Sequence, residues 1–116
     1  MDRLTLALLT FDVGTPAASP DAFADRVCAQ VREAWDDGAD LVVLPEFLWM
    51  GLEPFVADED KLRGVARLFW TDLWPRLALR LAQADKGVGL GTVPFLGPDG
   101  LLRNRAPIWD GVAFRH

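Results

Sequence analysis

Glu46 is the residue in this chain best placed to do chemistry, because it follows a short apolar run that ends in a proline. Leu41 to Leu44 predict a strand buried on both faces, of the kind that parallel sheets use. Pro45 has no N–H to donate, so strand pairing should stop there and leave Glu46 at the carboxyl end, where open α/β folds bind ligands. We expect apolar neighbours to disfavour its charged form, as suits a general base.

Three large apolar residues follow this carboxylate closely in the sequence: Phe47, Trp49 and Met50. Two interpretations of them stay open. They either line a substrate pocket beside Glu46 or belong to the ordinary hydrophobic core.

Other residues with chemical potential have simpler interpretations. Cys28 lies within a predicted helix, with no His or Lys nearby in sequence to lower its thiol pKa, so we interpret it as packing rather than as a nucleophile. His116 has no Cys or His partner, so we predict no metal site. The glycines of residues 87 to 91 follow a helix and open a strand, the reverse of a dinucleotide fingerprint, and no phosphate-binding loop accompanies the acid of Glu46. We therefore predict no cofactor.

Glu46 must be positioned by the segments that precede it. Leu4 to Phe11 predict a first buried strand, and Ser19-Pro20-Asp21 predict the start of a helix with a capping hydroxyl and a proline in its first turn. Gly38 can end that helix. Strand, helix and strand then form a right-handed crossover unit with two parallel strands.

The segments that follow Glu46 predict a second set of elements. Residues 49–57 contain a glycine and a proline and predict a loop, and residues 58–87 follow a helical period that Pro75 interrupts, leaving one kinked helix or two. Val88 to Val93 predict a strand, and Pro98-Asp99-Gly100 a turn that leads to an antiparallel strand over Leu101 to Trp109. Asp110-Gly111 would then make another turn before a fifth strand opens over 112–115.

Composition restricts the class of protein. The chain has 116 residues, 51% of them hydrophobic, with a net charge of −5 and a pI near 4.7. The negative charge argues against nucleic acid or an anionic membrane surface as partner, and no stretch approaches the ~20 apolar residues of a membrane span. A single cysteine fits a reducing compartment, so we expect a cytoplasmic protein.

The segment from Gly38 to Glu46 (GADLVVLPE) resembles the first signature of the nitrilase, or carbon–nitrogen hydrolase, superfamily. Leu4 to Leu9 resemble the first strand of that family, and two further segments resemble the strand pair that precedes its catalytic lysine: Gly91 to Pro94, and Asn104 to Gly111. The resemblance covers most of the chain in the family's order. It implies a Glu-Lys-Cys mechanism on a small amide or nitrile substrate, with Glu46 as general base.

The resemblance also implies the N-terminal half of an αββα sandwich: an α/β fold with one mixed sheet and helices on one face. The chain stops at His116, before the expected lysine and cysteine, so residues 1–116 would be a partial domain that is inactive by itself. We expect an exposed apolar sheet face, and either homo-oligomers or association with a missing C-terminal half. The alternatives are a non-catalytic α/β interaction module or truncated fragment, and a small nucleotide-binding domain.

Overall fold

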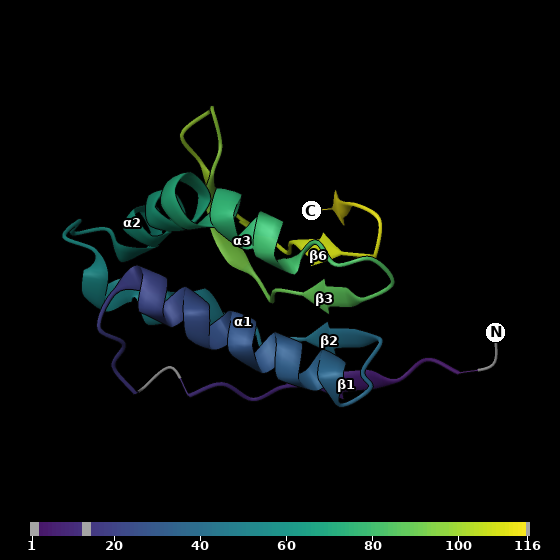
Figure 1. Cartoon of the computed structure of the whole chain (residues 1–116). Coiled ribbons are helices and arrows are strands. Elements are labelled where there is room, and N and C mark those ends of the chain that lie inside the picture. The colour runs from purple at the N-terminus through teal and green to yellow at the C-terminus, as the bar shows by residue number, and fades with distance from the viewer. Residues whose placement is uncertain (1–2, 13–14, 116) are drawn as a thin grey trace.

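The computed structural model describes residues 3–12 and 15–115 and shows a mixed α/β fold (Figure 1). Strand β1 (Leu6–Leu8), helix α1 (Pro20–Asp36) and strand β2 (Leu41–Val43) form the expected crossover unit. The two strands are parallel, with Ala7 opposite Val42. This confirms the arrangement predicted for the segments that lead to Glu46.

Helix α1 begins and ends where the sequence indicates. Ser19 is the N-cap, and its hydroxyl oxygen accepts a hydrogen bond from the backbone N–H of Ala22 at 3.0 Å. Pro20 occupies the first turn, where its missing N–H has no helical partner to lose. After the helix, Gly38 has a φ of +109°, a left-handed conformation that glycine adopts without a steric penalty.

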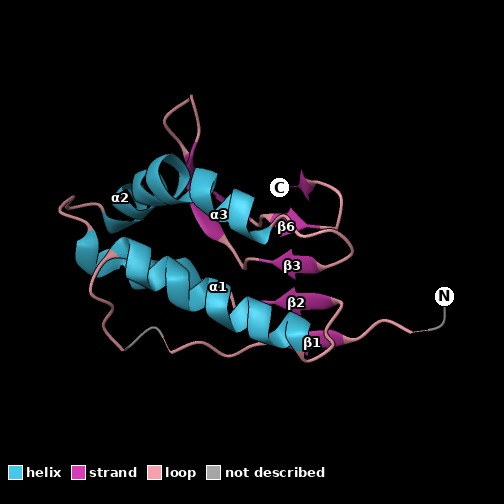
Figure 2. Ribbon diagram, viewed as in Figure 1, coloured by secondary structure: helices cyan, strands magenta, loops and turns pink. Residues whose placement is uncertain are grey.

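The main sheet has five strands in the order β1-β2-β3-β6-β7 (Figure 2). Strand β3 (Gly87–Gly89) is parallel to β2, whereas β6 (Ile108–Trp109) and β7 (Phe114–Arg115) are antiparallel to their neighbours. Helices α1 and α3 (Trp74–Leu81) both pack on one face of this sheet, where ion pairs Asp25–Arg80 (2.6 Å) and Asp21–Arg76 (2.8 Å) join them. The sheet is therefore mixed, with these helices on one face.

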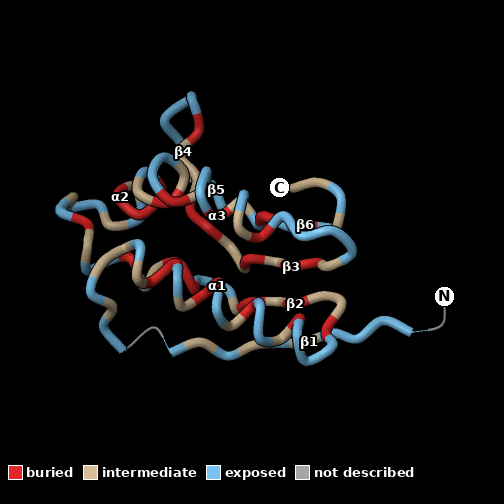
Figure 3. Tube along the Cα trace, viewed as in Figure 1, coloured by how far each residue is buried: buried red, intermediate tan, exposed pale blue. Residues whose placement is uncertain are grey.

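The prediction of a long, buried first strand is wrong. Strand β1 has only three residues and lies at the edge of the sheet, where Leu6 is 51% and Leu8 73% exposed (Figure 3). Because alternate strand residues face opposite sides, only Ala7 of β1 faces the helices. The apolar run correctly predicted a strand, but it could not show that one face of this strand would remain exposed to solvent.

The predicted loop over residues 49–57 is also wrong, because the chain forms a 3₁₀ helix, η1 (Leu48–Phe55). Leu48, Trp49 and Leu52 are buried on one side of η1, which gives the segment a regular apolar face. A Cβ at Gly51 would collide with the ring of Phe23 in α1, so the glycine permits this close contact.

The helical stretch around Pro75, for which the sequence left open one kinked helix or two, is one continuous run with a π-helical turn inside it. Helix α2 (Lys61–Arg67) continues through a π-helical turn, η2 (Leu68–Leu73), directly into α3. Pro75 lies in the first turn of α3. The π turn precedes the proline because a proline cannot donate to the carbonyl four residues before it.

The last part of the chain forms more and shorter strands than predicted. Residues 88–93 divide between β3 and β4 (Val93–Leu96), and residues 101–109 divide between β5 (Leu102–Arg105) and β6. Strands β4 and β5 form a separate two-stranded antiparallel sheet, so Pro94 can sit within a strand that has one paired edge. The hairpin turn at 97–101 and the turn at 110–113 are confirmed.

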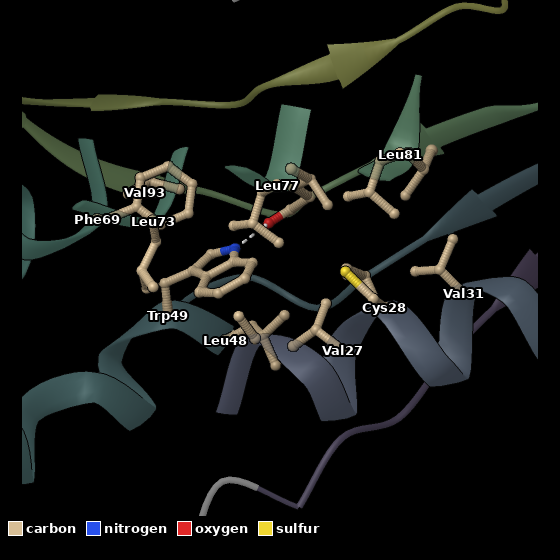
Figure 4. Close-up of a cluster of buried hydrophobic side chains, with 14 of the residues drawn as sticks. Val27, Cys28, Val31, Leu48, Trp49, Phe69, Leu73, Leu77, Leu81 and Val93 are labelled. Carbon is tan, nitrogen blue, oxygen red and sulfur yellow. Dashed lines mark hydrogen bonds between the residues drawn. The ribbon is translucent and has the colours of Figure 1, made fainter. Parts of the chain in front are cut away.

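The core lies between the helices and the covered sheet face. It combines α1, η1, the α2–α3 stretch and the strands around one cluster, part of which Figure 4 shows. Trp49 is completely buried at its centre and donates its indole N–H to the carbonyl of Leu90 at 3.0 Å. Within residues 3–12 and 15–115, no helix has the length and apolar character needed to cross a bilayer.

Candidate active site

Glu46 lies just beyond the carboxyl end of β2, as predicted. Leu44 extends the pairing by one residue, since its N–H donates to the carbonyl of Gly89 on β3 at 2.9 Å. Pro45 then ends the pairing, and Glu46 follows it on the surface. Glu46 therefore lies at the carboxyl ends of the parallel strands, which is where parallel α/β folds bind ligands.

The surroundings of Glu46 differ from the expected apolar walls. Glu46 is exposed, and among the described residues its carboxylate has no hydrogen-bond or ion-pair partner. Apolar enclosure would have to come from atoms other than those of residues 3–12 and 15–115. The described chain thus supplies an accessible acid, without the desolvation expected of it.

The three proposed pocket residues lie in different surroundings. Phe47 is its exposed neighbour, with 55% of its surface accessible. Trp49 points into the core between α1 and the α2–α3 stretch (Figure 4), so for this residue the structure favours the core interpretation. Met50 is half-buried and lines a surface hollow of about 580 Å³ together with Gly51, Glu53, Pro54 and Lys61.

Cys28 lies in the core, as its position within the predicted helix indicates. Its side chain projects from α1 among buried apolar side chains (Figure 4) and is completely inaccessible. Burial raises the pKa of the thiol, although Arg80 and Arg32 act in the opposite direction. Because the thiolate is the reactive form, these surroundings are unsuited to a nucleophile.

No metal-binding site is found in the described part of the chain. Residues 3–12 and 15–115 contain no group of three or more His, Cys, Asp or Glu side chains arranged to hold a metal ion. His116, for which no ligand role is predicted, lies outside the described residues.

Two of the three glycines within residues 87–91 allow another part of the chain to approach closely. A Cβ at Gly87 would lie 3.0 Å from Leu41 Cδ1, and one at Gly91 would collide with the carbonyl oxygen of Pro45. At Gly89, a Cβ would meet nothing within 4 Å. The prediction of close backbone packing holds for Gly87 and Gly91, and fails for Gly89.

Arg105, in the segment from Asn104 to Gly111 that resembles the family, packs on an aromatic ring. Its guanidinium carbon lies 3.6 Å from the centroid of Phe95, the two side chains belonging to neighbouring strands β5 and β4. Such a cation–π contact stabilises the hairpin. The side chain therefore has a structural role in the described fold.

Two residues next to Glu46 are missing from the sequence-based site: Gly91 and Thr92. Gly91 touches the backbone of Pro45, and the Thr92 hydroxyl oxygen accepts a hydrogen bond from the N–H of Phe47 at 3.4 Å. The sequence showed only that both follow the β3 segment. Their contact with residues 45 to 47 arises because β2 and β3 are neighbours in the sheet.

Comparison with protein-family models and with curated proteins finds no match for this chain.

Proposed function

We propose that this chain supplies the general base of an amidase- or nitrilase-like carbon–nitrogen hydrolase, and that Glu46 is that base. The observation that carries the proposal is an accessible carboxylate at the carboxyl end of a central parallel strand. The resemblance of residues 38–46 to the nitrilase signature adds to it. Both point to the same side chain.

The chemistry gives Glu46 three successive tasks. An amide or nitrile carbon is a poor electrophile, so a thiolate attacks it and a base must first accept the thiol proton. The same group then returns the proton to the departing amine and later activates a water molecule against the thioester. A lysine stabilises the negative charge that develops on the substrate. In this proposal the lysine and the cysteine come from polypeptide beyond residues 1–116.

The exposure of Glu46 fits a site that is completed by further polypeptide. An exposed carboxylate is solvated and is a weak base, whereas a partner surface that covers it would disfavour its charge and strengthen it as a base. On this proposal, residues 1–116 alone do not hydrolyse amides or nitriles.

The decisive test begins with the reading frame downstream of His116. We expect it to encode a lysine shortly after the β7 segment and a cysteine after a further strand. In the polypeptide that includes them, Glu46→Gln should lower amide or nitrile hydrolysis by about 10²–10⁴-fold, the usual contribution of a general acid–base. Glu59→Gln, at another exposed glutamate, is the matched control and should leave the rate unchanged.

Two results would contradict the proposal. One is full hydrolytic activity in the Glu46→Gln variant. The other is hydrolysis by residues 1–116 alone that disappears in Cys28→Ala, since that would make the buried thiol the nucleophile.

A second candidate function is a non-catalytic interaction module, which the uncovered sheet face favours. Leu6, Leu8 and Ile108 are exposed on that face, and Leu4 and Val112 extend it beside a hollow of about 530 Å³. Two sheets packed face to face interdigitate such apolar rows at a separation of ~10 Å. The partner in this case is a protein segment that presents a second apolar sheet face.

Size-exclusion chromatography and dye binding test this second candidate. If the face binds protein, residues 1–116 should either associate or bind a hydrophobic dye, and Leu6→Ser with Leu8→Ser should reduce both. A compact monomer that binds no dye would argue against it.

A further inference from the structure

The turn that carries Glu46 contains a conformation that is unfavourable for its residue type. Phe47 has φ 59° and ψ 11°, in the left-handed region. For a residue with a side chain this conformation costs roughly 1–2 kcal/mol, so the surroundings must enforce it. Strain of this kind gathers at functional sites, where it fixes the direction of a group.

Strand β3 and the residues after it enforce that conformation from one side. Gly91 has φ +71°, and its backbone lies so close to the Pro45 carbonyl that any Cβ would collide with it. Thr92 then accepts a long hydrogen bond, 3.4 Å, from the N–H of Phe47. These two contacts flank Glu46 on both sides in the sequence.

The chain is also anchored before and after the turn. Before it, the Leu44 N–H donates to Gly89 at 2.9 Å. After it, Trp49 is buried and donates its indole N–H to Leu90 at 3.0 Å, while the Met50 N–H donates to the carbonyl of Phe47 at 3.0 Å. The backbone around Glu46 is thus held at successive points, while its own side chain remains exposed.

We infer that Gly91 and Thr92 are positioning residues for Glu46: they hold Pro45 to Phe47 in the strained turn that leaves Glu46 exposed just beyond the carboxyl end of β2. The role assigned to the turn, which is to position a catalytic base, rests on the proposed function. The geometry of the turn does not, because it is a property of residues 1–116 themselves. A pre-set backbone removes the need to order the acid when substrate binds.

The experiment compares variants of residues 1–116 by NMR spectroscopy. In the unmodified chain, the three-bond HN–Hα coupling and the ¹³C shifts of Phe47 should indicate a positive φ. Gly91→Ala should shift the backbone resonances of Pro45 to Phe47 and abolish the left-handed signature. Gly89→Ala is the matched control, two residues earlier at the end of β3, where a Cβ meets nothing within 4 Å. It should leave these resonances in place.

A second pair of variants keeps the test decisive if Gly91→Ala does not fold. Thr92→Val retains the shape of the side chain and removes the acceptor, so amide exchange at Phe47 should become several-fold faster. Thr92→Ser restores a hydroxyl and should return the rate to that of the unmodified chain. A negative φ at Phe47, or equal exchange in Thr92→Val and the unmodified chain, would overturn the inference.

Failure of the turn and failure of the proposed function have different signatures. If the NMR changes occur but Glu46→Gln leaves hydrolysis by the longer polypeptide unaffected, the turn is real and the hydrolase proposal is wrong. If Glu46→Gln abolishes hydrolysis while Gly91→Ala and Thr92→Val leave Phe47 unchanged, Glu46 is the base but these residues do not position it. If all hold, Thr92→Val should lower kcat and Thr92→Ser should restore it, with KM little changed.

Discussion

The two faces of the five-stranded sheet differ sharply although the same short strands form both. One face presents Ala7, Val42, Val88 and Trp109 to the helices, and all but Ala7 are buried. The other face presents Leu6, Leu8, Val43 and Ile108, of which Leu8 is 73% and Ile108 43% exposed. Both sets are apolar. Side-chain type therefore did not decide which face the helices cover.

The difference shows where the stability of the described fold originates. Apolar area contributes only when it leaves water, at roughly 25 cal/mol per Å². The open-face leucines keep most of their area in water, so they add little to folding and remain available for a partner.

Replacing one residue on each face by aspartate should separate the faces most clearly. Val42→Asp places a charge in a fully buried site without a partner, and we expect more than about 4 kcal/mol of destabilisation, enough to prevent cooperative folding. Leu8→Asp, at an exposed position in the adjacent edge strand, should change the free energy of unfolding by less than about 1 kcal/mol. Urea unfolding followed by circular dichroism measures both. Equal losses would mean that the open face is covered in solution.

The helical cover of the sheet can be tested on a single helix. Leu77 of α3 is buried in the core cluster, whereas Leu79 on the same helix is 83% exposed. Leu77→Ala should lower the free energy of unfolding by about 2–5 kcal/mol, because it leaves a cavity. Leu79→Ala is the matched control and should change it by less than about 0.5 kcal/mol. Similar values for the two variants would contradict the packing of α3.

Two glycines of β3 test how much free space the open face has. A Cβ at Gly89 meets nothing within 4 Å, so Gly89→Val should gain up to about 1 kcal/mol from the strand preference of valine. At Gly87, a Cβ would lie 3.0 Å from Leu41 Cδ1 and 3.3 Å from the Trp109 carbonyl oxygen, so Gly87→Val should destabilise. Thermal unfolding measures the sign of each change. Destabilisation by Gly89→Val would show that the open face has no room for a side chain at this position.

Lowering the pH should have a smaller effect, which is limited to the outer strand β7 and the turn before it. Backbone N–H groups of Ala113 and Val112, together with the Arg115 side chain, lower the pKa of Asp110 from 3.8 to about 2. The carboxylate therefore stabilises the turn at pH values above 3.8, and this contribution disappears as the pH falls through 2. Amide exchange at Phe114 should accelerate over that interval before exchange at Val88 does. Asp110→Asn should remove the pH dependence, and simultaneous acceleration at both amides would contradict it.

Local sequence signals correctly located several boundaries. Ser19 and Pro20 mark the start of α1, and Pro98-Asp99-Gly100 mark the β4–β5 turn, because caps and turns depend on a few adjacent residues. The position of Glu46 after β2 follows in the same way from Pro45. Its exposure does not follow, since it depends on which surfaces other segments occupy.

Where the sequence did not indicate the secondary structure of a segment, packing in the folded chain determined it. The loop expected over 49–57 became the 3₁₀ helix η1 because Trp49 and Leu52 pack into the core, and Gly51 admits the ring of Phe23. The left-handed turn at Phe47 has no signal in its own residue type, which disfavours it. It exists because Gly91, more than forty positions later, meets the Pro45 carbonyl.

Local signals along the chain are enough to predict the α/β class of the described fold, the crossover from β1 to β2 and a carboxylate at the end of a parallel strand. These depend on chain-local properties: apolar runs, helix caps and the missing N–H of proline. Those local signals do not predict which sheet face is covered, that Trp49 belongs to the core, or that Gly91 and Thr92 contact the turn that bears Glu46. Those outcomes depend on contacts between residues that are distant in sequence. Such contacts form because they bury the most apolar area in the chain as a whole.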